Sequence, residues 1–509
     1  MMINIGSLIQ HRAMLSPNKE GLVDDRRMTF RELNQEVNRA AHAFRAMGIQ
    51  AGQRIALLCK NHRSFVTAFF GAAKCGIITI PINWRLHPQE IQYILEDSGA
   101  SILIYDAAFS DKVQQLQPIS TVQRYIPVGN SESGDPSFDA LISSCPTDEP
   151  ELETTGDDCI LIMYTSGTTG KPKGAVITHT NLLFASIGFT HVIDWWERDR
   201  FLSVAPFFHI GGFVPLITNI HTGATSILMA DFDPIRVWKT VEQERITTMM
   251  TVPAMLTAMH QVFDQAAADI FSLRNITCGA SAVPKTLIEA FAQRGISVQQ
   301  VYGITEYTGA VSFWKKEMDP TKSDSMGKTV FHGEVKIIDV NTKKELPAGQ
   351  VGEIVCRGPQ VFTGYWQRPQ ETAETVEDGW LHTGDLGMVD QDGFLYVVDR
   401  LKDMIISGGE NIYSTELEMV LLQHPGVAEV AVIGVPDERW GEIPRAYVVP
   451  RSGWSITAEE LIQHCRERLA SYKCIKEVVF LEQLPRNAVG KILKVQLKQE
   501  AAKHSASNA

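Results

Sequence analysis

The sequence lacks several features that would assign it to large classes of proteins. Its 47 Lys and Arg are outnumbered by 59 Asp and Glu, for a net charge of −12, so we expect no nucleic-acid partner, because such binding needs a basic surface. Its eight Cys form no Cys-x-x-Cys pair, which is typical of reduced thiols in a cytoplasmic protein. No apolar run reaches about 18 residues, so we expect no membrane-spanning helix. No secretory signal is visible at the N-terminus. The composition leaves a weak peripheral membrane contact and a homodimer open.

What is present indicates several domains of the α/β class. The 509 residues exceed the size at which a single core stops growing. Up to about residue 330, helix signals such as the capping box Thr29-x-x-Glu32 alternate with strand-like runs such as RIALLC at 54–59, which indicates parallel sheets covered by helices. Short strands separated by turns over about 333–399 predict a β-rich subdomain. After residue 399 the pattern starts again as a compact α+β unit.

One loop stands out by its composition. Residues 164–174 read YTSGTTGKPKG, which contains many hydrogen-bond donors and no acidic residue. Its glycines let backbone N–H groups approach an anion closely, so the loop suits a polyphosphate. It is not a Walker A loop, because Thr165 and Pro172 stand where that motif needs Gly and a hydroxyl residue. A flexible surface linker is the alternative, but strand-like runs flank the loop on both sides.

The loop and six further motifs carry a resemblance to a known family. TSGTTGKPKG at 165–174 resembles the phosphate loop of the adenylate-forming superfamily, which includes acyl-CoA synthetases, luciferases and the adenylation domains of peptide synthetases. The other motifs, in order, are PFFHIGG (206–212), GASAV (279–283), YGITE (302–306), GWLHTGD (379–385), DRLKDMIISGGENI (399–412) and PRNAVGKILK (485–494). The resemblance spans nearly the whole chain and is closest to fatty-acyl-CoA and aryl-CoA ligases.

The resemblance implies an ATP-dependent acyl-CoA synthetase with two half-reactions. A carboxylic acid and ATP give an acyl-adenylate and pyrophosphate, and coenzyme A then forms the thioester and releases AMP. The resemblance implies Mg²⁺ bound by Glu306, and Thr305 at the α-phosphate. Lys491 would lie over the α-phosphate and the substrate carboxylate, and His209 between the acid and the thiol tunnel. These four residues form the expected catalytic set.

The resemblance also implies the nucleotide-binding residues. Tyr302 would stack on adenine, and Asp385 and Arg400 would contact the ribose. The whole implied ATP- and AMP-binding set is Thr165, Ser166, Gly167, Thr168, Thr169, Gly170, Lys173, Gly279, Ala280, Ser281, Tyr302, Gly303, Asp385 and Arg400.

A hinge and a coenzyme A site follow from the same resemblance. It implies an N-terminal domain over 1–399, a hinge at 400–403 with Lys402 as its pivot, and a small mobile α+β domain over 404–509. The implied coenzyme A contacts are Ser407, Gly408, Gly409, Trp440 and Lys473. Ile475 stands where the family usually has Pro, which puts the shape of that loop in doubt.

The implied acyl pocket indicates a monocarboxylic acid with an apolar body. Its residues are Ile210, Gly211, Thr251, Val252 and Gly309. The stretches around them contain no Arg or Lys to pair with a second carboxylate, whose burial would cost several kcal/mol. We expect Gly211, Gly212, Gly303 and Gly309 to leave room for a medium- or long-chain fatty acid, with an aryl acid as the alternative. DWWERDR at 194–200 indicates a membrane-surface or lid element, or a packed Trp pair.

Three other functions remain open at this stage. The enzyme could load a carrier protein in place of coenzyme A, and a comparison of the two thiols with one acid would decide. It could be a luciferase-like oxygenase, which oxygen uptake would reveal. It could also be an inactive nucleotide-binding module, although the presence of Glu306, Asp385, Arg400 and Lys491 together argues against that function.

Overall fold

The structure of the protein is a computed structural model. It describes residues 4–507 except 117–120, 130–135, 153, 166–170, 282, 408–409, 438, 472 and 487–491. The chain divides into two compact units. The first comprises Met1–Val335, Val355–His382 and Gly393–Leu395, and the second comprises Lys336–Ile354, Thr383–Asp392 and Tyr396–Ala509. The β-rich segment over 333–399 is thus divided between the units, and the domain boundary at residue 399 stays a prediction.

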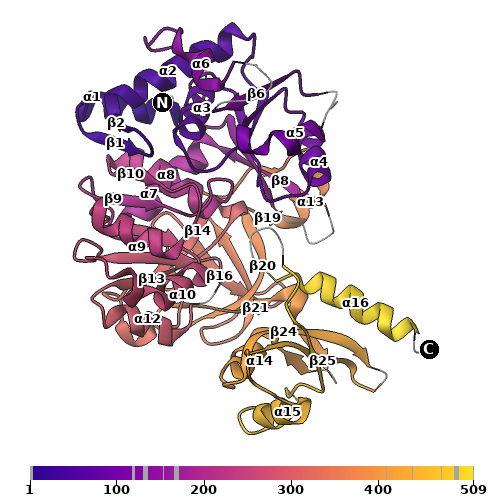
Figure 1. Ribbon diagram of the computed structural model, residues 1–509. Helices are drawn as coiled ribbons and strands as arrows, with labels where there is room; N and C mark the ends of the chain where they lie inside the picture. The colour runs from indigo at the N-terminus through magenta and orange to yellow at the C-terminus, as the bar shows by residue number, and fades with distance from the viewer. Residues whose placement is uncertain are drawn as a thin grey trace. The chain divides into compact units, whose positions relative to one another are not determined.

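The first unit is built on two large sheets that are parallel at the centre (Figure 1). The nine-stranded sheet has the order β15-β14-β13-β12-β11-β9-β10-β1-β2. Its strands are β1 (Glu20–Val23), β2 (Arg27–Thr29), β9 (Arg200–Ser203), β10 (Thr225–Leu228), β11 (Thr248–Thr251), β12 (Asn275–Gly279), β13 (Ser297–Ile304), β14 (Gly309–Trp314) and β15 (Lys328–Thr329). Antiparallel strands lie toward its two edges.

The seven-stranded sheet has the order β18-β8-β7-β4-β3-β5-β6. Its strands are β3 (Arg54–Leu58), β4 (Ile78–Pro81), β5 (Ile102–Asp106), β6 (Arg124–Val128), β7 (Cys159–Thr165), β8 (Lys173–Thr178) and β18 (Gly364–Tyr365). Residues of β3, β4 and β5 are almost completely buried, as expected for parallel strands covered on both faces. The predicted class, α/β with parallel sheets, is confirmed.

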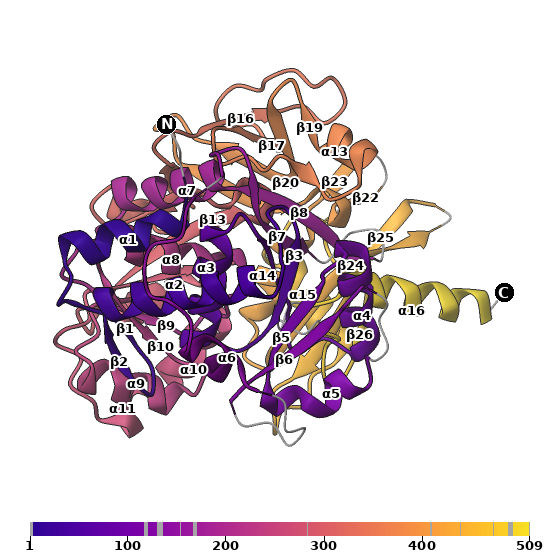
Figure 2. The same ribbon diagram turned by 90° about the horizontal axis from the view of Figure 1, so that it is seen from above.

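The helix that begins after Thr29 combines an amphipathic pattern with a cap. Thr29 accepts a hydrogen bond from the Glu32 N–H and the Glu32 carboxylate accepts one from the Thr29 N–H, which confirms the predicted capping box. Helices α1, α2 and α3 pack against one another (Figure 2). The helices of this unit are α1 (Gly6–Leu15), α2 (Phe30–Ala46), α3 (Arg63–Lys74), α4 (Pro88–Ser98), α5 (Ser110–Gln114), α6 (Phe138–Ser143), α7 (His179–Val192), α8 (Ile210–Thr222), α9 (Pro234–Gln243), α10 (Pro253–Gln261), α11 (Phe263–Ala266), α12 (Lys285–Ala292) and α13 (Pro369–Thr375). No helix within the described ranges is both long and apolar enough to cross a bilayer.

Two five-stranded sheets account for the rest of the strands. One has the order β16-β17-β20-β19 with β21 beside β20, and the other the order β23-β22-β25-β24 with β26 beside β25. The strands are β16 (Glu334–Ile338), β17 (Gly352–Arg357), β19 (Val376–Glu377), β20 (Trp380–Val389), β21 (Leu395–Arg400), β22 (Ile405–Ser407), β23 (Glu410–Ile412), β24 (Val427–Asp437), β25 (Gly441–Pro450) and β26 (Glu477–Phe480). The helices of the second unit are α14 (Ser414–Leu422), α15 (Ala458–Arg466) and α16 (Lys494–Ser507). The α+β character predicted after residue 399 is therefore confirmed.

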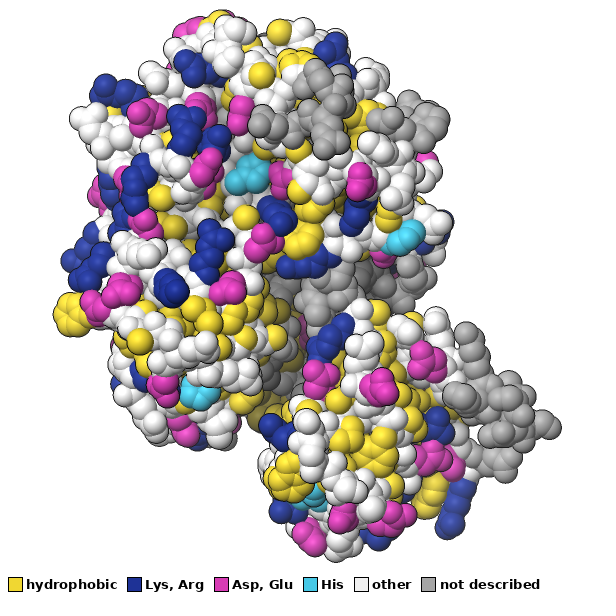
Figure 3. Space-filling model, viewed as in Figure 1, with side chains coloured by type: hydrophobic (Ala, Val, Ile, Leu, Met, Phe, Trp, Pro, Cys, Tyr) yellow, Lys and Arg dark blue, Asp and Glu magenta, His cyan; other side chains and the backbone are white. Residues whose placement is uncertain are grey.

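The surface carries both signs of charge in close mixture. On the face drawn in Figure 3, dark blue Lys and Arg alternate with magenta Asp and Glu over the part of the first unit that is coloured.

Candidate active site

Four neighbouring strands place predicted site residues at the same edge of the nine-stranded sheet. β9, β11, β12 and β13 are mutually parallel. Their C-terminal ends lead to the segment before His209, to Val252, to Ala280 and to Thr305. Ligands of open parallel sheets bind outside the carboxyl ends of the strands. The PFFH, TVPA, GAS and YGITE motifs therefore share one edge, which their wide separation in the sequence does not show.

Close contacts with Val301 and Gly309 explain two glycines of this edge. A Cβ on Gly279 would lie 2.4 Å from Cγ1 of Val301, and a Cβ on Gly303 would lie 2.2 Å from the carbonyl oxygen of Gly309. Ala280, directly after β12, has a φ of 73°, a left-handed conformation that costs a residue with a side chain about 1–3 kcal/mol and clusters at ligand sites. The Tyr302 side chain on β13 is mostly buried, at 9% exposure.

The glycines expected to leave room for an acyl chain fall into two groups. Gly212 approaches the carbonyl oxygen of Pro206, which a Cβ would meet at 2.3 Å, and Gly303 is equally constrained. For these two the expectation was wrong, because the space is filled by backbone. A Cβ on Gly211 would meet only Cε of Met250, at 3.4 Å, and one on Gly309 only side-chain carbons at 3.6 Å or more. Gly211 and Gly309 therefore leave the space that side chains would otherwise fill.

His209 is the residue at the N-cap of α8, and its ring has unusual surroundings. Its Nε2 atom is buried and has no hydrogen-bond partner among the described residues. Burial, and to a lesser degree the positive charge of Arg85, lower the pKa of His209 to about 4. The imidazole is thus neutral near pH 7, and the hydrogen-bonding capacity of its Nε2 is unused by the described residues. The exposed Arg85 has its guanidinium 5.8 Å from the centre of the Phe208 ring, beside His209. It lies outside the sequence stretches used to predict the acyl pocket, so the sequence analysis missed this cation.

The phosphate-loop motif is held at the end of a hairpin. β7 and β8 pair in antiparallel register, with Thr165 opposite Lys173. Gly174 is required in this hairpin, because a Cβ there would lie 2.5 Å from Cγ2 of Ile162. Ser166, Gly167, Thr168, Thr169 and Gly170 lie outside the described residues. The structure therefore places the two ends of the loop, and phosphate binding by its central residues stays a prediction.

Glu306 is linked to this hairpin through Tyr365, a residue that the sequence did not single out. Tyr365 lies in β18, which pairs with β8. Its hydroxyl donates to Oε1 of Glu306 at 2.7 Å, and the Lys173 ammonium lies 5.2 Å from the centre of the Tyr365 ring. Burial and the Glu306 charge raise the pKa of Tyr365, so it stays a neutral donor. The Tyr365 hydroxyl is a neutral partner that leaves the Glu306 carboxylate charged, and a carboxylate is a ligand that fits a divalent cation.

In the second unit, Asp385 and Arg400 contact each other. Asp385 is 3% exposed on β20, and its Oδ1 lies 3.0 Å from Nε of Arg400 at the end of β21. Lys402 follows in the short turn Leu401–Asp403. The carbonyl of Lys402 accepts a hydrogen bond from Nζ of Lys498 at 3.1 Å, and burial lowers the pKa of the Lys402 ammonium.

The residues predicted to contact coenzyme A are only partly placed. Ser407 ends β22 and is buried. Trp440 is 44% exposed, with the Arg439 guanidinium 4.8 Å from its ring centre. Lys473 donates to both oxygens of Glu416 at 2.8 Å, so it is engaged in an ion pair. Gly408, Gly409 and Lys491 lie outside the described residues.

Comparisons with known proteins agree with these motifs. The model of the AMP-binding enzyme family matches residues 9–366, and that of the AMP-binding enzyme C-terminal domain matches residues 416–491. A long-chain-fatty-acid–CoA ligase of Mycobacterium tuberculosis is 40% identical over 507 residues, covering 98% of this chain and 99% of that protein. A feruloyl-CoA synthase of an Amycolatopsis species is 40% identical over 498 residues, covering 97% and 98%.

A solved structure extends the likeness to three dimensions. The o-succinylbenzoate CoA synthetase of Bacillus subtilis in complex with ATP and magnesium ion has a TM-score of 0.86 at 34% identity, covering 97% of this chain and 99% of that one. Another structure of the same synthetase holds its acyl-adenylate intermediate.

Proposed function

Because this chain belongs to the family of AMP-binding enzymes and is an acid–thiol ligase that forms acyl-CoA or aryl-CoA, we propose that its organic substrate is a medium- or long-chain fatty acid. The observation that carries this proposal is the unoccupied side-chain space at Gly211 and Gly309. It is bordered by Met250, Val214 and Ile210, apolar groups that favour an apolar acyl body. The 40% identity to a long-chain-fatty-acid–CoA ligase supports the same choice.

The reaction proceeds through two displacements. In the first, a carboxylate oxygen of the acid attacks the α-phosphorus of ATP, and the bond from that phosphorus to the pyrophosphate oxygen breaks. In the second, the sulfur of coenzyme A attacks the acyl carbon, the carbon–oxygen bond to AMP breaks, and the thiol proton goes to solvent. The first step concentrates negative charge at one phosphorus, so its catalysis needs donors aimed there.

Each donor has a proposed task in this step. The phosphates would be held by Thr165, Ser166, Gly167, Thr168, Thr169, Gly170 and Lys173. The nucleotide site would be shaped by Gly279, Ala280, Ser281 and Gly303. Thr305 donates to the α-phosphate, and Lys491 neutralises charge on it and orients the acid. Glu306 would hold Mg²⁺, which when bound neutralises phosphate oxygens. Tyr365 keeps the Glu306 carboxylate in one orientation through its 2.7 Å hydrogen bond.

To contact the ribose, Asp385 and Arg400 would have to exchange their mutual ion pair for hydrogen bonds to the ribose. Asp385 and Arg400 pair with each other at 3.0 Å, and we assign the ribose hydroxyls to both. The hydroxyls would donate to Asp385, and Arg400 would donate to the ribose oxygens. Tyr302 would offer adenine the part of its ring that is not buried.

A rotation about the hinge would switch the enzyme from adenylation to thioester formation. Residues 400–403, with Lys402 as pivot, would let the C-terminal domain withdraw Lys491 and present a path for coenzyme A. Ser407, Gly408, Gly409 and Trp440 would line this path. Lys473 would have to leave Glu416 to contact coenzyme A, so it is the least supported member of that set.

An aryl acid is the second candidate, and the 40% identity to a feruloyl-CoA synthase favours it. The deciding experiment is a pyrophosphate-release screen across fatty, aryl and dicarboxylic acids, with coenzyme A, with a phosphopantetheinyl carrier protein, or with neither. Preferred turnover of medium- or long-chain fatty acids supports the proposal. Preferred turnover of aryl acids refutes the choice of fatty acid, and selective turnover with the carrier protein refutes coenzyme A as the acceptor.

A further inference from the structure

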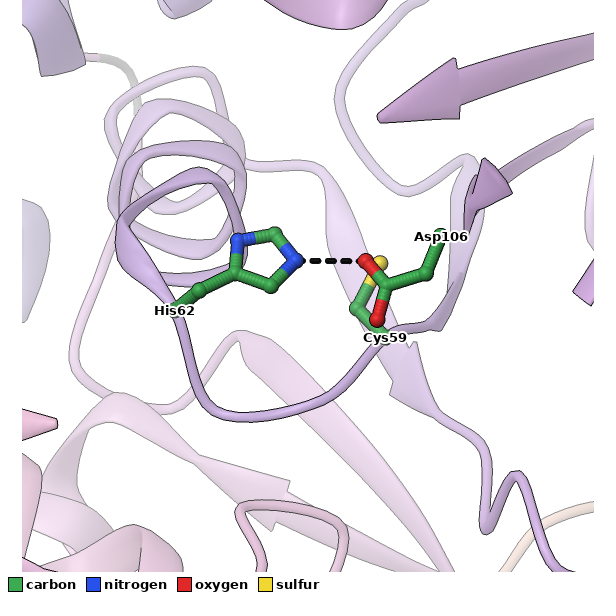
Figure 4. Close-up of side chains that lie close together, drawn as sticks. All are labelled: Cys59, His62 and Asp106. Atoms are coloured by element: carbon green, nitrogen blue, oxygen red, sulfur yellow. Dashed lines mark hydrogen bonds and ion pairs between the residues drawn. The ribbon is translucent and has the colours of Figure 1, made fainter. Parts of the chain in front are cut away.

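One cluster of side chains of the metal-binding types lies outside the predicted site. Cys59 and His62, which follow β3, lie close to Asp106, the last residue of β5 (Figure 4), with their ligand atoms within 4.8 Å of one another. Such a trio has the composition of a transition-metal site. However, His62 Nδ1 accepts the N–H of Ser64 at 3.2 Å, so its proton lies on Nε2, where it faces Asp106 Oδ1 at 2.5 Å. Both ring nitrogens are thus engaged, and a metal would have to displace the Nε2 proton together with its hydrogen bond to Asp106. The cluster is therefore satisfied by its own hydrogen bonds.

The cluster instead holds a short loop. Besides His62, Asp106 accepts the backbone N–H of Lys60 at 2.8 Å through Oδ2. The Cys59 thiol donates to the carbonyl of Ile104 at 3.6 Å. Residues 59–62, which connect β3 to α3, are thus fixed to the end of β5. Asn61 stands in the middle of this loop.

Both polar atoms of the Asn61 side-chain amide form hydrogen bonds with one distant segment of the chain. Its Nδ2 donates to the carbonyls of Ser203, at 3.2 Å, and Ala205, at 2.9 Å, and its Oδ1 accepts the N–H of Phe207 at 3.0 Å. Asn61 is 4% exposed, so these bonds form away from water. The segment 203–207 connects β9 to the PFFH motif.

The path from this segment to His209 has little freedom. The His209 N–H donates to the carbonyl of Pro206 at 3.1 Å, and the Gly212 N–H donates to the carbonyl of His209 at 2.9 Å. Gly212 lies so close to Pro206 that a Cβ would come within 2.3 Å of the Pro206 oxygen. A displacement of 203–207 would therefore be transmitted to the His209 backbone and ring.

We propose that Asn61 is a positioning residue for the acid substrate. By holding 203–207 through three hydrogen bonds, it directs the unpartnered Nε2 of His209 to the acid and sets the affinity of the enzyme for the acid, with no effect on ATP. This inference rests on the proposed function, in which His209 borders the acid.

The first test compares two buried asparagines. Asn61→Ala is expected to raise KM for the acid about tenfold and to leave KM for ATP within about twofold. The matched control is Asn38→Ala, because Asn38 is 1% exposed and also makes three hydrogen bonds, to Thr147, Glu149 and Lys74. It should lower the melting temperature and leave KM for the acid unchanged. An unchanged KM for the acid in Asn61→Ala, or an equal rise in both variants, would overturn the inference.

A double-mutant cycle then separates positioning through His209 from a general structural effect. Asn61→Ala should raise KM for the acid in the wild type and have almost no further effect in His209→Ala. Equal fold-changes in the two backgrounds would refute the inference. Asn61→Ser, whose hydroxyl keeps one donor and one acceptor, replaces Asn61→Ala if that variant does not fold, with a smaller rise expected.

The outcomes also distinguish this inference from the proposed function. If the wild type shows no acid-dependent pyrophosphate release, the proposed function is wrong, and the positioning role of Asn61 is refuted as well. If the wild type is active and His209→Ala alters KM for the acid while Asn61→Ala does not, only the inference fails.

Discussion

The hydrogen bond from Tyr365 to Glu306 provides a direct test of the proposed binding of Mg²⁺ and ATP by Glu306. Tyr365→Phe removes the hydroxyl that lies 2.7 Å from Oε1 of Glu306 and keeps the ring beside the Lys173 ammonium. A hydrogen bond to a charged group contributes about 1.5–3 kcal/mol. At about 1.4 kcal/mol per factor of ten, that corresponds to about 10- to 100-fold in an equilibrium constant. Loss of a group that orients a metal-binding carboxylate has effects of the same size.

We therefore expect Tyr365→Phe to raise the Mg²⁺ concentration for half-maximal pyrophosphate release about 10- to 100-fold. Thioester formation from a supplied acyl-adenylate should proceed at the wild-type rate, because no triphosphate takes part in it. Tyr93→Phe is the control, since it removes a similar phenol–carboxylate contact, 3.2 Å long, to Asp97. An identical Mg²⁺ dependence in Tyr365→Phe and wild type would refute the reasoning.

Three further predictions concern the lysines of the C-terminal part and a buried histidine. Lys491→Ala should cost about 3–4 kcal/mol of transition-state stabilisation in adenylation and spare thiolysis of a supplied acyl-adenylate, as measured in separate half-reaction assays; unchanged adenylation would end that assignment. Lys402→Pro should slow thioester formation more than adenylation, and equal losses in stopped-flow measurements of both steps would count against the hinge. His179 is fully buried and its pKa is lowered by burial to about 4, below an ordinary value of about 6.5, so the unfolded state binds more protons between these values. The contribution of His179 to the free energy of unfolding should therefore be constant above about pH 6.5 and fall by about 3 kcal/mol as the pH drops to about 4. Urea unfolding across this range, with His179→Gln as the variant that loses this sensitivity, measures the effect, and an equal acid sensitivity in both would contradict it.

Features set by local sequence were predictable. The capping box at Thr29 depends on residues three positions apart, and it is present. The alternation of helices with buried strands predicted parallel sheets, because a strand buried on both faces needs a continuous apolar run. The family itself followed from ordered motifs, because each preserves the spacing of groups around one ligand.

Features set by contacts between distant segments were not predictable. Tyr365 donates to Glu306 across 59 positions, and no local pattern marks a tyrosine for that contact. Asn61 reaches Ser203 across 142 positions, and Arg85 reaches the ring of Phe208 from outside the pocket motifs. Gly212 and Gly303 were misread for the same reason, because only the fold brings a carbonyl oxygen against each.

In the proposed reaction, the acid attacks the α-phosphorus of ATP and the sulfur of coenzyme A later attacks the acyl carbon. The most direct measurement supplies a fatty acid labelled with ¹⁸O in both carboxylate oxygens, together with ATP, Mg²⁺ and coenzyme A, and analyses the products by mass spectrometry. This reaction should give acyl-CoA with one ¹⁸O, AMP with one ¹⁸O and unlabelled pyrophosphate. ADP with labelled phosphate, or AMP without the label, would contradict it.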